Sequence, residues 1–295
     1  MDTDDTEARK RSEDYLSFVS SVVESPRLRW WLIALSLLTV SCGAPLFNLP
    51  AGPGAPATDI RTAKAEATNG CRAVSTMTAE AAVSGSIGGR RVRARLLVGL
   101  ASPASARLEA FAFGAQLFVF VARGDDATLL LTRDRRVLQH GRPQAVLEAV
   151  TALPLDAADL RVALLGCVAG ADTDRGSQLG DDWRVVPDGT TEVYLRRVPH
   201  TAPWRVVAAV HQDPGRPAWR AEYRDFAGDL PRTVRFVSSD AKRFDLRLAL
   251  SQVELNVKLD AAAFEVNVPP GTDPITLDEL RQNGPLGAAP GSDGR

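Results

Sequence analysis

The chain has 295 residues, of which 24% are charged and 45% are hydrophobic, and its formal net charge is −1. This composition is typical of a globular protein with one large domain or two small ones. The near-zero charge argues against a nucleic-acid-binding protein, because neutralising phosphates requires clustered Lys and Arg. The one dense basic cluster, at positions 90, 91, 93 and 95, fits the solvated face of a strand.

Residues 30–40 form an apolar run without a charged side chain. Arg27 and Arg29 precede the run and a small residue ends it, which is the pattern of a secretory signal. The run is shorter than the about 20 residues that a transmembrane helix needs. A buried core helix is the alternative, and the Pro-rich stretch after the run disfavours it. We therefore predict that residues 1–42 are a signal region, removed up to Cys42.

The segment Leu38-Thr39-Val40-Ser41-Cys42 resembles the lipobox of bacterial lipoproteins, in which the thiol is diacylated and the chain is cut just before it. Thr39 departs from the common pattern, which prefers Leu at that place. The resemblance implies that Cys42 carries a diacylglycerol and an N-linked acyl group, and that no other cofactor is needed. Several acyl chains on one residue anchor a protein firmly, whereas a single chain does not.

Gly43 comes directly after the cysteine. In well-studied Gram-negative systems an Asp at this place retains a lipoprotein at the inner membrane, so the resemblance implies an outer-membrane lipoprotein that faces the periplasm. Residues 43–57 are rich in Pro, Gly and Ala and are predicted to be a tether. Asp59 can then cap a helix over 59–74, with its small and apolar residues on one stripe.

Beyond this helix the period of the apolar residues changes from 3.6 to 2, which predicts strands. The turns between these strands are short and contain Gly, Pro or Asp. Short turns indicate an antiparallel meander, because parallel strands need crossovers of about a dozen residues. The predicted strands of this first group cover residues 76–86, 91–100, 106–113, 116–122 and 127–132.

Two short helices, over 142–152 and 156–165, are predicted to interrupt the meander, with Pro154 between them and Asp156 as a cap. The remaining elements are strands over 183–186, 191–198, 204–211, 218–225, 233–238 and 244–258, a last short strand over 264–270 and a helical turn over 277–282. About eleven strands form one contiguous system, so we predict a single domain over 58–282 and a disordered tail over 283–295.

Cys71 and Cys167 remain once Cys42 is assigned to the lipobox. An even pair in an oxidising compartment predicts a disulfide, and two unpaired buried thiols are the alternative. Two cysteines and three scattered histidines show no metal-ligand spacing, so we expect no metal site.

The sequence contains no motif that would indicate catalysis. A P-loop, an H-E-x-x-H zinc motif, a C-x-x-C pair and a G-x-S-x-G nucleophile elbow are all absent from it. His211 lies on a predicted strand, where a satisfied or exposed histidine is a better interpretation than a general base. We name no catalytic residue and expect a protein that is not an enzyme.

The order of these elements resembles the LolA/LolB lipoprotein-localisation carriers and their lipidated relatives. The resemblance rests on the lipobox, on the succession of helix, meander, two mid-chain helices and further strands, and on the ending Phe264-x-Val266-x-Val268-Pro269-Pro270-Gly271. It covers about residues 57–282. It implies a mainly β (α+β) fold: a strongly curved antiparallel sheet that forms an incomplete β-barrel, with an N-terminal helix and two mid-chain helices capping the opening.

The same resemblance implies an apolar cavity that shelters acyl chains. A half-barrel of about eleven strands has more inward surface than its own side chains need fill, and a filled, dry core is the alternative. The outer-membrane receptor of this group pushes lipid into the membrane with a protruding apolar loop residue. The turns at 114–115 and 124–125 show no unambiguous exposed Leu. The predicted cavity-lining residues are Val92, Leu96, Val98, Val234, Phe236, Leu246, Leu248 and Leu250.

We expect a membrane-anchored lipoprotein that binds or accepts a lipid or a lipidated protein as its partner. A periplasmic sensor or scaffold module on the same fold is the alternative. The sequence does not identify the client or the oligomeric state.

Overall fold

The structure is a computed structural model that describes residues 45–168, 175–215, 217–240 and 242–283. The chain divides into two compact units, 1–47 and 48–295, and of the first unit only the last three residues are described. Cys42, the lipobox and nearly all of the predicted tail therefore lie outside the described residues. The sheet and its helices belong to the unit 48–295.

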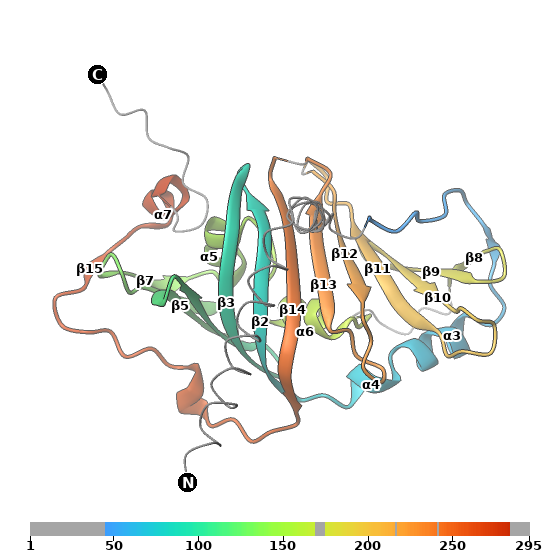
Figure 1. Ribbon diagram of the computed structural model, residues 1–295, viewed down its shortest axis with the longest axis horizontal. Coiled ribbons are helices and arrows are strands. Elements are labelled where there is room, and N and C mark those ends of the chain that lie inside the picture. The colour runs from blue at the N-terminus through green and yellow to red at the C-terminus, as the bar shows by residue number, and fades with distance from the viewer. Residues whose placement is uncertain (1–44, 169–174, 216, 241, 284–295) are drawn as a thin grey trace, which may run out of the picture. The chain divides into compact units, whose positions relative to one another are not determined.

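One curved sheet of 15 strands dominates this unit (Figure 1). All neighbouring strands are antiparallel except β15 and β7, which are parallel. The strands are β1 (Ala55–Pro56), β2 (Thr76–Ile87), β3 (Arg90–Ala101), β4 (Ser105–Ala112), β5 (Ala115–Arg123), β6 (Asp126–Leu131), β7 (Arg136–Gly141), β8 (Ser177–Leu179), β9 (Trp183–Asp188), β10 (Thr191–Arg196), β11 (Arg205–His211), β12 (Trp219–Arg224), β13 (Thr233–Ser238), β14 (Phe244–Leu255) and β15 (Asp273–Pro274).

The sheet joins two meanders through its longest strands. The strand order is β1-β8-β9-β10-β11-β12-β13-β14-β2-β3-β4-β5-β6-β7-β15, so β14 pairs with β2 in the middle and the two ends stay open. This arrangement confirms the predicted incomplete barrel. The eleven main predicted strands are all present, and the structure adds β7 and the short strands β1, β8 and β15.

Irregular positions in the central strands accompany the curvature. The register of β14 against β2 shifts between Ser251 and Glu254, and Gln252 has a φ of 49°. On β2, Gly85 has a φ of 140°, and a Cβ there would collide with the backbone carbonyl of Asp245. Bulges of this kind bend a strand and increase its twist, which keeps a long sheet from lying flat.

Two helices lie on one face of the sheet, behind the strands as seen in Figure 1. Helix α5 (Pro143–Thr151) begins with Pro at its first position, and α6 (Ala157–Leu165) begins with a capping box between Asp156 and Asp159. Ala152 and Gly166 end the two helices in the left-handed conformation. The predicted cap at Asp156 is thus present, and both helices place their apolar residues against the sheet.

The predicted N-terminal helix is broken into α3 (Ile60–Ala67) and α4 (Asn69–Arg72). Thr68 leaves the helical conformation, and its hydroxyl donates to the carbonyl of Lys64 at 2.8 Å. Asp59 does not cap α3 through its side chain, because its carboxylate accepts from Arg184 at 2.7 and 3.0 Å. Helix α3 packs against β9, β10 and β11.

The predicted strand over 264–270 is wrong. The segment begins in the 3-10 helix η1 (Ala261–Phe264) and continues without sheet pairing until β15, crossing the face of the sheet opposite α5 and α6 (Figure 1). The guanidinium of Arg107 donates to the carbonyls of Ala263 and Glu265 at 3.1 and 2.9 Å. Phe264 packs against apolar residues on the outer side of β5. The alternating apolar residues therefore contact the sheet's outer surface and do not extend its hydrogen-bonded ladder. Helix α7 (Leu277–Asn283) comes next and packs against α5.

Candidate functional site

An apolar cavity of about 60 Å³ lies between the sheet and the two helices α5 and α6. Because side chains alternate across a strand, one face of β2 to β5, β13 and β14 points toward the helices, and part of that face lines this space. Its lining consists of Val83, Ile87, Val92, Ala94, Leu96, Leu108, Ala110, Phe118, Phe236, Leu246 and Leu248 from the strands, and Leu147, Thr151, Leu153 and Leu160 from the helices and their connection.

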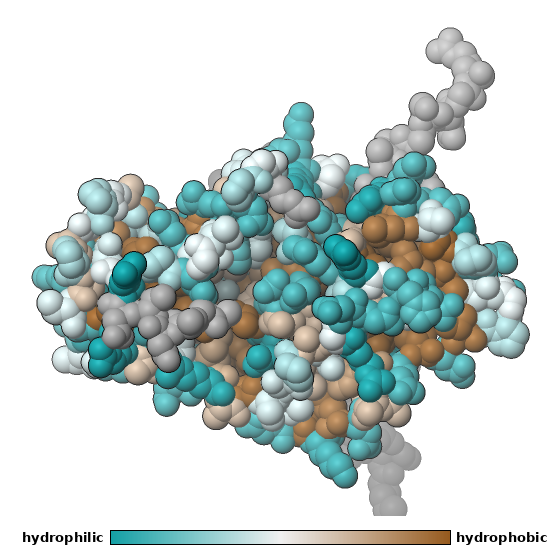
Figure 2. All heavy atoms as spheres, turned by 180° about the vertical axis from the view of Figure 1, so that it is seen from behind, coloured by the Kyte–Doolittle hydropathy of each residue, from teal (hydrophilic) through white to brown (hydrophobic). Residues whose placement is uncertain are grey.

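The cavity offers contact area and almost no hydrogen bonding. Among the described residues Thr151 is the only polar one that lines it, and its hydroxyl donates to the carbonyl of Leu147 at 2.8 Å within α5. A site of this chemistry binds hydrocarbon through burial and dispersion. Seen from the helix side, Figure 2 shows hydrophobic surface exposed in patches between hydrophilic atoms.

The structure brings five of the eight predicted cavity residues to this cavity: Val92, Leu96, Phe236, Leu246 and Leu248. The other three, Val98, Val234 and Leu250, are buried in the same core without lining the cavity. Ala110 and Phe118 also line the cavity and were not among the residues predicted to do so. Both lie on predicted strands, so the alternation of side chains along those strands could have identified them. Helices α5 and α6 cover the cavity, whereas α3 lies elsewhere on the sheet.

An ion pair joins α5 to the turn before β14. Glu148 on α5 accepts from Arg243, in the turn before β14, at 2.6 Å, and about a quarter of each side chain is exposed. A hollow of about 430 Å³ beside this pair is lined by Ile87, which also lines the cavity. A movement of α5 away from the turn before β14 requires the Glu148–Arg243 pair to separate.

Cys71 and Cys167 form a disulfide in the structure, with their Cα atoms 6.0 Å apart. Cys71 is in α4, and Cys167 comes directly after Gly166 at the end of α6. The bridge thus ties the C-terminal end of one cavity-covering helix to the N-terminal part of the domain.

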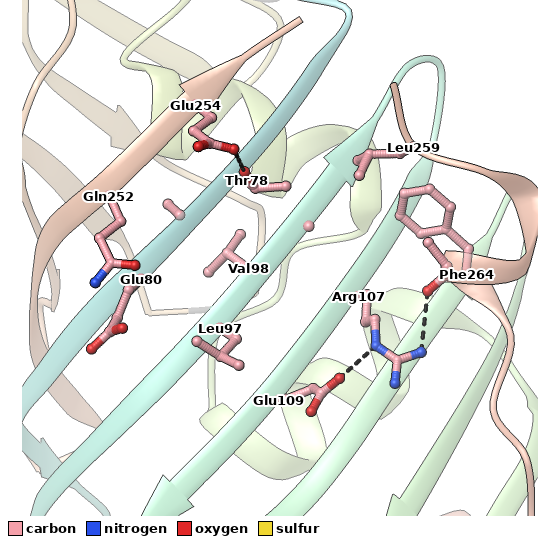
Figure 3. A pocket seen from close by; sticks show the side chains of 13 residues that line it. Thr78, Glu80, Leu97, Val98, Arg107, Glu109, Gln252, Glu254, Leu259 and Phe264 are labelled. Carbon is pink, nitrogen blue, oxygen red and sulfur yellow. Dashed lines mark hydrogen bonds and ion pairs between the residues drawn. The ribbon is translucent and has the colours of Figure 1, made fainter. Parts of the chain in front are cut away.

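A second hollow, of about 370 Å³, lies on the outer face of the sheet beneath the segment after β14 (Figure 3). Its charged groups are engaged in contacts within the chain. Arg107 donates to Glu109 at 2.6 Å as well as to backbone carbonyls, Thr78 donates to Glu254 at 3.5 Å, and Arg95 lies 2.7 Å from Glu80. Its charged groups thus already have partners within the chain, and Arg107 uses them to hold the C-terminal segment against the sheet.

A third hollow, of about 360 Å³, has a polar lining and lies on the other flank of α6 from the apolar cavity. We call it the polar pocket; its polar lining residues are Gln144, Asp159, Asp188, Thr190, Thr191, His211, Asp213, Trp219 and Tyr223. The His211 ring stacks on Trp219 with 3.8 Å between centroids, and its Nδ1 lies 2.8 Å from the Thr191 hydroxyl. His211 is therefore a satisfied histidine, one of the two interpretations that the sequence favoured.

Burial lowers the pKa of His211 to about 4, against the opposing influence of Asp213 and Asp188. Between about pH 6.5 and pH 4 the unfolded chain binds a proton at this position that the folded chain does not bind. We therefore expect this residue to lower the free energy of unfolding as the pH falls through that range, by roughly 3 kcal/mol in total.

Urea unfolding at several pH values measures this effect. His211→Gln should flatten the dependence of stability on pH over this range. The matched control is His140→Gln, since the side chain of His140 is 85% exposed. Equal pH dependence in His211→Gln and the unmodified chain would contradict the assignment.

Among the described residues, no group of three His, Cys, Asp or Glu side chains could hold a metal ion. Within the same part of the chain, no helix is both long and apolar enough to cross a bilayer.

No protein-family model and no curated protein matches this sequence. Solved structures do match. The LolA superfamily protein NE2245 from Nitrosomonas europaea is 10% identical with a TM-score of 0.50, over 70% of this chain and 97% of its own. This chain has a LolA/LolB-like fold.

Two further structures are similar at lower scores. One is a domain named for outer-membrane lipoprotein sorting from Vibrio parahaemolyticus, 12% identical with a TM-score of 0.44 over 70% of this chain and 94% of its own. The other is the lipoprotein LppX from Mycobacterium tuberculosis, 12% identical with a TM-score of 0.30 over 68% and 96%. At these identities the likeness concerns the LolA-like fold alone.

Proposed function

We propose that this protein is a lipid-binding lipoprotein of the outer membrane, anchored through acyl groups on Cys42 and facing the periplasm. It takes up the acyl chain of a lipid or of a lipidated protein, and it does not make or break covalent bonds. The observation that carries this proposal is the apolar lining of the cavity under α5 and α6. Transfer of an acyl chain from water to such a lining is favourable by about 0.8 kcal/mol for each methylene group.

The size of the cavity determines how uptake must occur. Small-molecule pockets measure about 300–1,000 Å³, whereas this cavity measures about 60 Å³. An acyl chain therefore enters only if α5 and α6 move away from the sheet. We infer that this movement begins beside the Glu148–Arg243 pair, which joins α5 to the turn before β14.

The LolA-like fold supports the same proposal, since the Nitrosomonas protein belongs to the LolA superfamily by name. A curved open sheet with helices on one face supplies a large apolar surface and a cover that can move. We infer that α5 and α6 act as that cover, while the central strands β14, β2 and β3 stay fixed.

A chain-length series tests the proposal directly. We expect decanol, dodecanol and tetradecanol to displace a fluorescent fatty acid from the full chain carrying Cys42→Ala, with affinity rising up to about fourfold for each added methylene. Failure of all three alcohols to bind would mean a filled core. The sensor or scaffold function would then be favoured instead.

A feature that the sequence analysis did not identify is an exposed aromatic residue at the turn between β4 and β5. The side chain of Phe113 is fully exposed, at 105% of its reference area, and its φ is 52°. Arg93 and Arg95 line the same surface hollow as Phe113. An exposed aromatic side chain next to basic residues suits the interface of an anionic membrane. We infer that this turn contacts the membrane that supplies or receives the lipid.

Phe113→Ser is expected to weaken co-sedimentation of the Cys42→Ala protein with phosphatidylglycerol vesicles by about tenfold, because burying a Phe side chain contributes roughly 1.5–3 kcal/mol. Val198→Ser is the matched control, since Val198 is also a large exposed apolar residue, at 56% exposure, on a different turn. Equal loss in both variants would show that general surface hydrophobicity, and not this turn, governs the contact.

A further inference from the structure

A surface hollow of about 590 Å³ lies beside the turn between β4 and β5. We call it the edge hollow; the residues of its lining that matter here are Val83, Arg93, Ala94, Arg95, Phe111 and Phe113. Strand β4 pairs with β3 only over residues 95–101 of β3. On the side of β4, residues 90–94 therefore have no strand partner in the described part of the chain, and this upper end of β3 has a free edge (Figure 1). A molecule that passes beside it from one face of the sheet to the other separates no paired strands.

Apolar residues from one face of the sheet and arginines from the other line the edge hollow. Val83 and Ala94 lie opposite each other on β2 and β3, and both also line the apolar cavity. Both are only partly buried, so this part of the cavity lining is accessible to solvent. Arg93 and Arg95 directly precede and follow Ala94, and their side chains therefore leave β3 on its other face. An apolar lining next to two cations suits a molecule with an apolar chain and an anionic end.

The positive charge of the edge hollow is only partly compensated. No Asp or Glu is among its described lining residues. Arg93 is exposed, and no ion pair or hydrogen bond joins it to another described residue. Arg95 is 56% exposed; its Nε lies 2.7 Å from Glu80, and its guanidinium lies 6.0 Å from the centre of the Phe111 ring. Arginine presents its N–H donors in a planar fork that matches the oxygens of a phosphate group.

We propose that the lipid bound by this protein carries an anionic phosphate headgroup, and that this headgroup lies in the edge hollow against Arg93 and Arg95. The acyl chain runs from the hollow past Val83 and Ala94 into the space under α5 and α6. This proposal rests on the proposed lipid binding. It adds the chemical class of the lipid and the place of its polar end.

The edge hollow lies at the end of the sheet where α5 is joined to the turn before β14. Gly88, in the turn between β2 and β3, donates its backbone N–H to the carbonyl of Arg243 at 2.9 Å. The turn between β4 and β5 lies at the same end, because β2 to β5 form an antiparallel meander. Separation of Glu148 from Arg243 and entry of a chain beside β3 therefore take place at one end of the domain.

Displacement of the neutral dye N-phenylnaphthylamine from the full chain carrying Cys42→Ala tests the proposal. The competitors are dodecanol and dodecyl phosphate, which have the same alkyl chain, each kept below the concentration at which it forms micelles. Dodecyl phosphate should bind about tenfold more tightly than dodecanol at low ionic strength. This preference should shrink as salt is added, because exposed charges are screened.

Arg93→Gln should reduce the preference for dodecyl phosphate severalfold and leave the affinity for dodecanol unchanged. Arg72→Gln is the matched control, since it removes the same charge at an exposed position on α4. It should leave both affinities unchanged. Inorganic phosphate, added at the concentration of the alkyl competitors, should also leave the preference unchanged, because without the alkyl chain it binds only weakly at an exposed site.

Each other result contradicts a different step. Dodecanol and dodecyl phosphate that bind equally tightly would overturn the headgroup site and leave lipid binding intact. Loss of the preference in the presence of inorganic phosphate would mean that the hollow binds the free anion, and would overturn the assignment to a lipid. An equal loss of both affinities in Arg93→Gln would also overturn it, since the arginine would then act on the cavity and not on the headgroup. If neither competitor displaces the dye, the proposed function itself is wrong.

Discussion

Replacing both Cys71 and Cys167 by Ser is expected to lower the free energy of unfolding by about 4 kcal/mol. The two residues are 96 positions apart, and loop-closure entropy gives about 4–5 kcal/mol for a loop of that length. The bridge restricts the unfolded chain far more than it restricts the sheet. Urea unfolding of the double variant against the unmodified chain measures the loss.

The control for this experiment is the unmodified chain unfolded in the presence of a reductant, which should match the double variant. Cys42→Ser should leave the stability unchanged if the cysteine pairing is as the structure has it. A loss under 1 kcal/mol in the double variant would contradict the entropic argument and would mean that the unfolded chain stays compact around these positions.

The strands were predictable from the sequence because one face of the sheet is buried. On β14, Leu246, Leu248 and Leu250 are buried, and they alternate with the more exposed Asp245, Arg247 and Ala249. The same period of two located ten other strands to within a few residues of their observed ends. The short turns between them then predicted that consecutive strands pair in an antiparallel way. Turn length is a local property of the chain and can be read from the sequence.

Of the four strands that were missed, β1 and β15 depend on partners distant in the sequence, whereas β7 and β8 pair with β6 and β9 next to them in the chain. Strands β1 and β8 pair only with each other and with β9 at one edge, and β15 pairs with β7 at the other. Each of the three has two or three residues, too few for a period to be seen. Conversely, Phe264 alternates with Val266 as a strand residue would, but Arg107 binds the backbone carbonyls of this segment.

The apolar cavity and the polar pocket differ in the same way, since one follows from local sequence patterns and the other depends on distant partners. The apolar cavity was expected, because inward residues of neighbouring strands must meet on the concave side. The polar pocket was not expected, because its groups come from the helices α5 and α6, the strands β9 to β12 and the turns beside them. His211 and Trp219 stack through the pairing of β11 with β12. Without that register, neither residue differs from an ordinary strand residue in the sequence.

The two sites lie in different halves of the sheet. Strands β2 to β5 with β13 and β14 line the apolar cavity, and β9 to β12 line the polar pocket. Helix α6 contributes to both, and the disulfide holds its C-terminal end. The outward movement of α5 and α6 that we propose for acyl-chain uptake would therefore also change the shape of the polar pocket.

Ala110→Leu is expected to reduce dodecanol binding at least tenfold while leaving the protein as stable as before, or more stable by up to about 1 kcal/mol. Ala110 is 2% exposed on β4 and faces the cavity. The larger side chain occupies space that is empty in the unliganded protein, so it adds buried apolar surface where an acyl chain would otherwise insert.

Displacement of a fluorescent fatty acid and urea unfolding are measured on the same preparation. Ala115→Leu is the matched control, because it makes the same chemical change at an exposed position at the start of β5. Loss of binding without loss of stability separates a ligand cavity from a filled core, in which overpacking would instead destabilise the fold by about 1–3 kcal/mol. If Ala110→Leu destabilises the protein by that amount, the space under α5 and α6 is part of an ordinary core and the acyl chain must bind elsewhere.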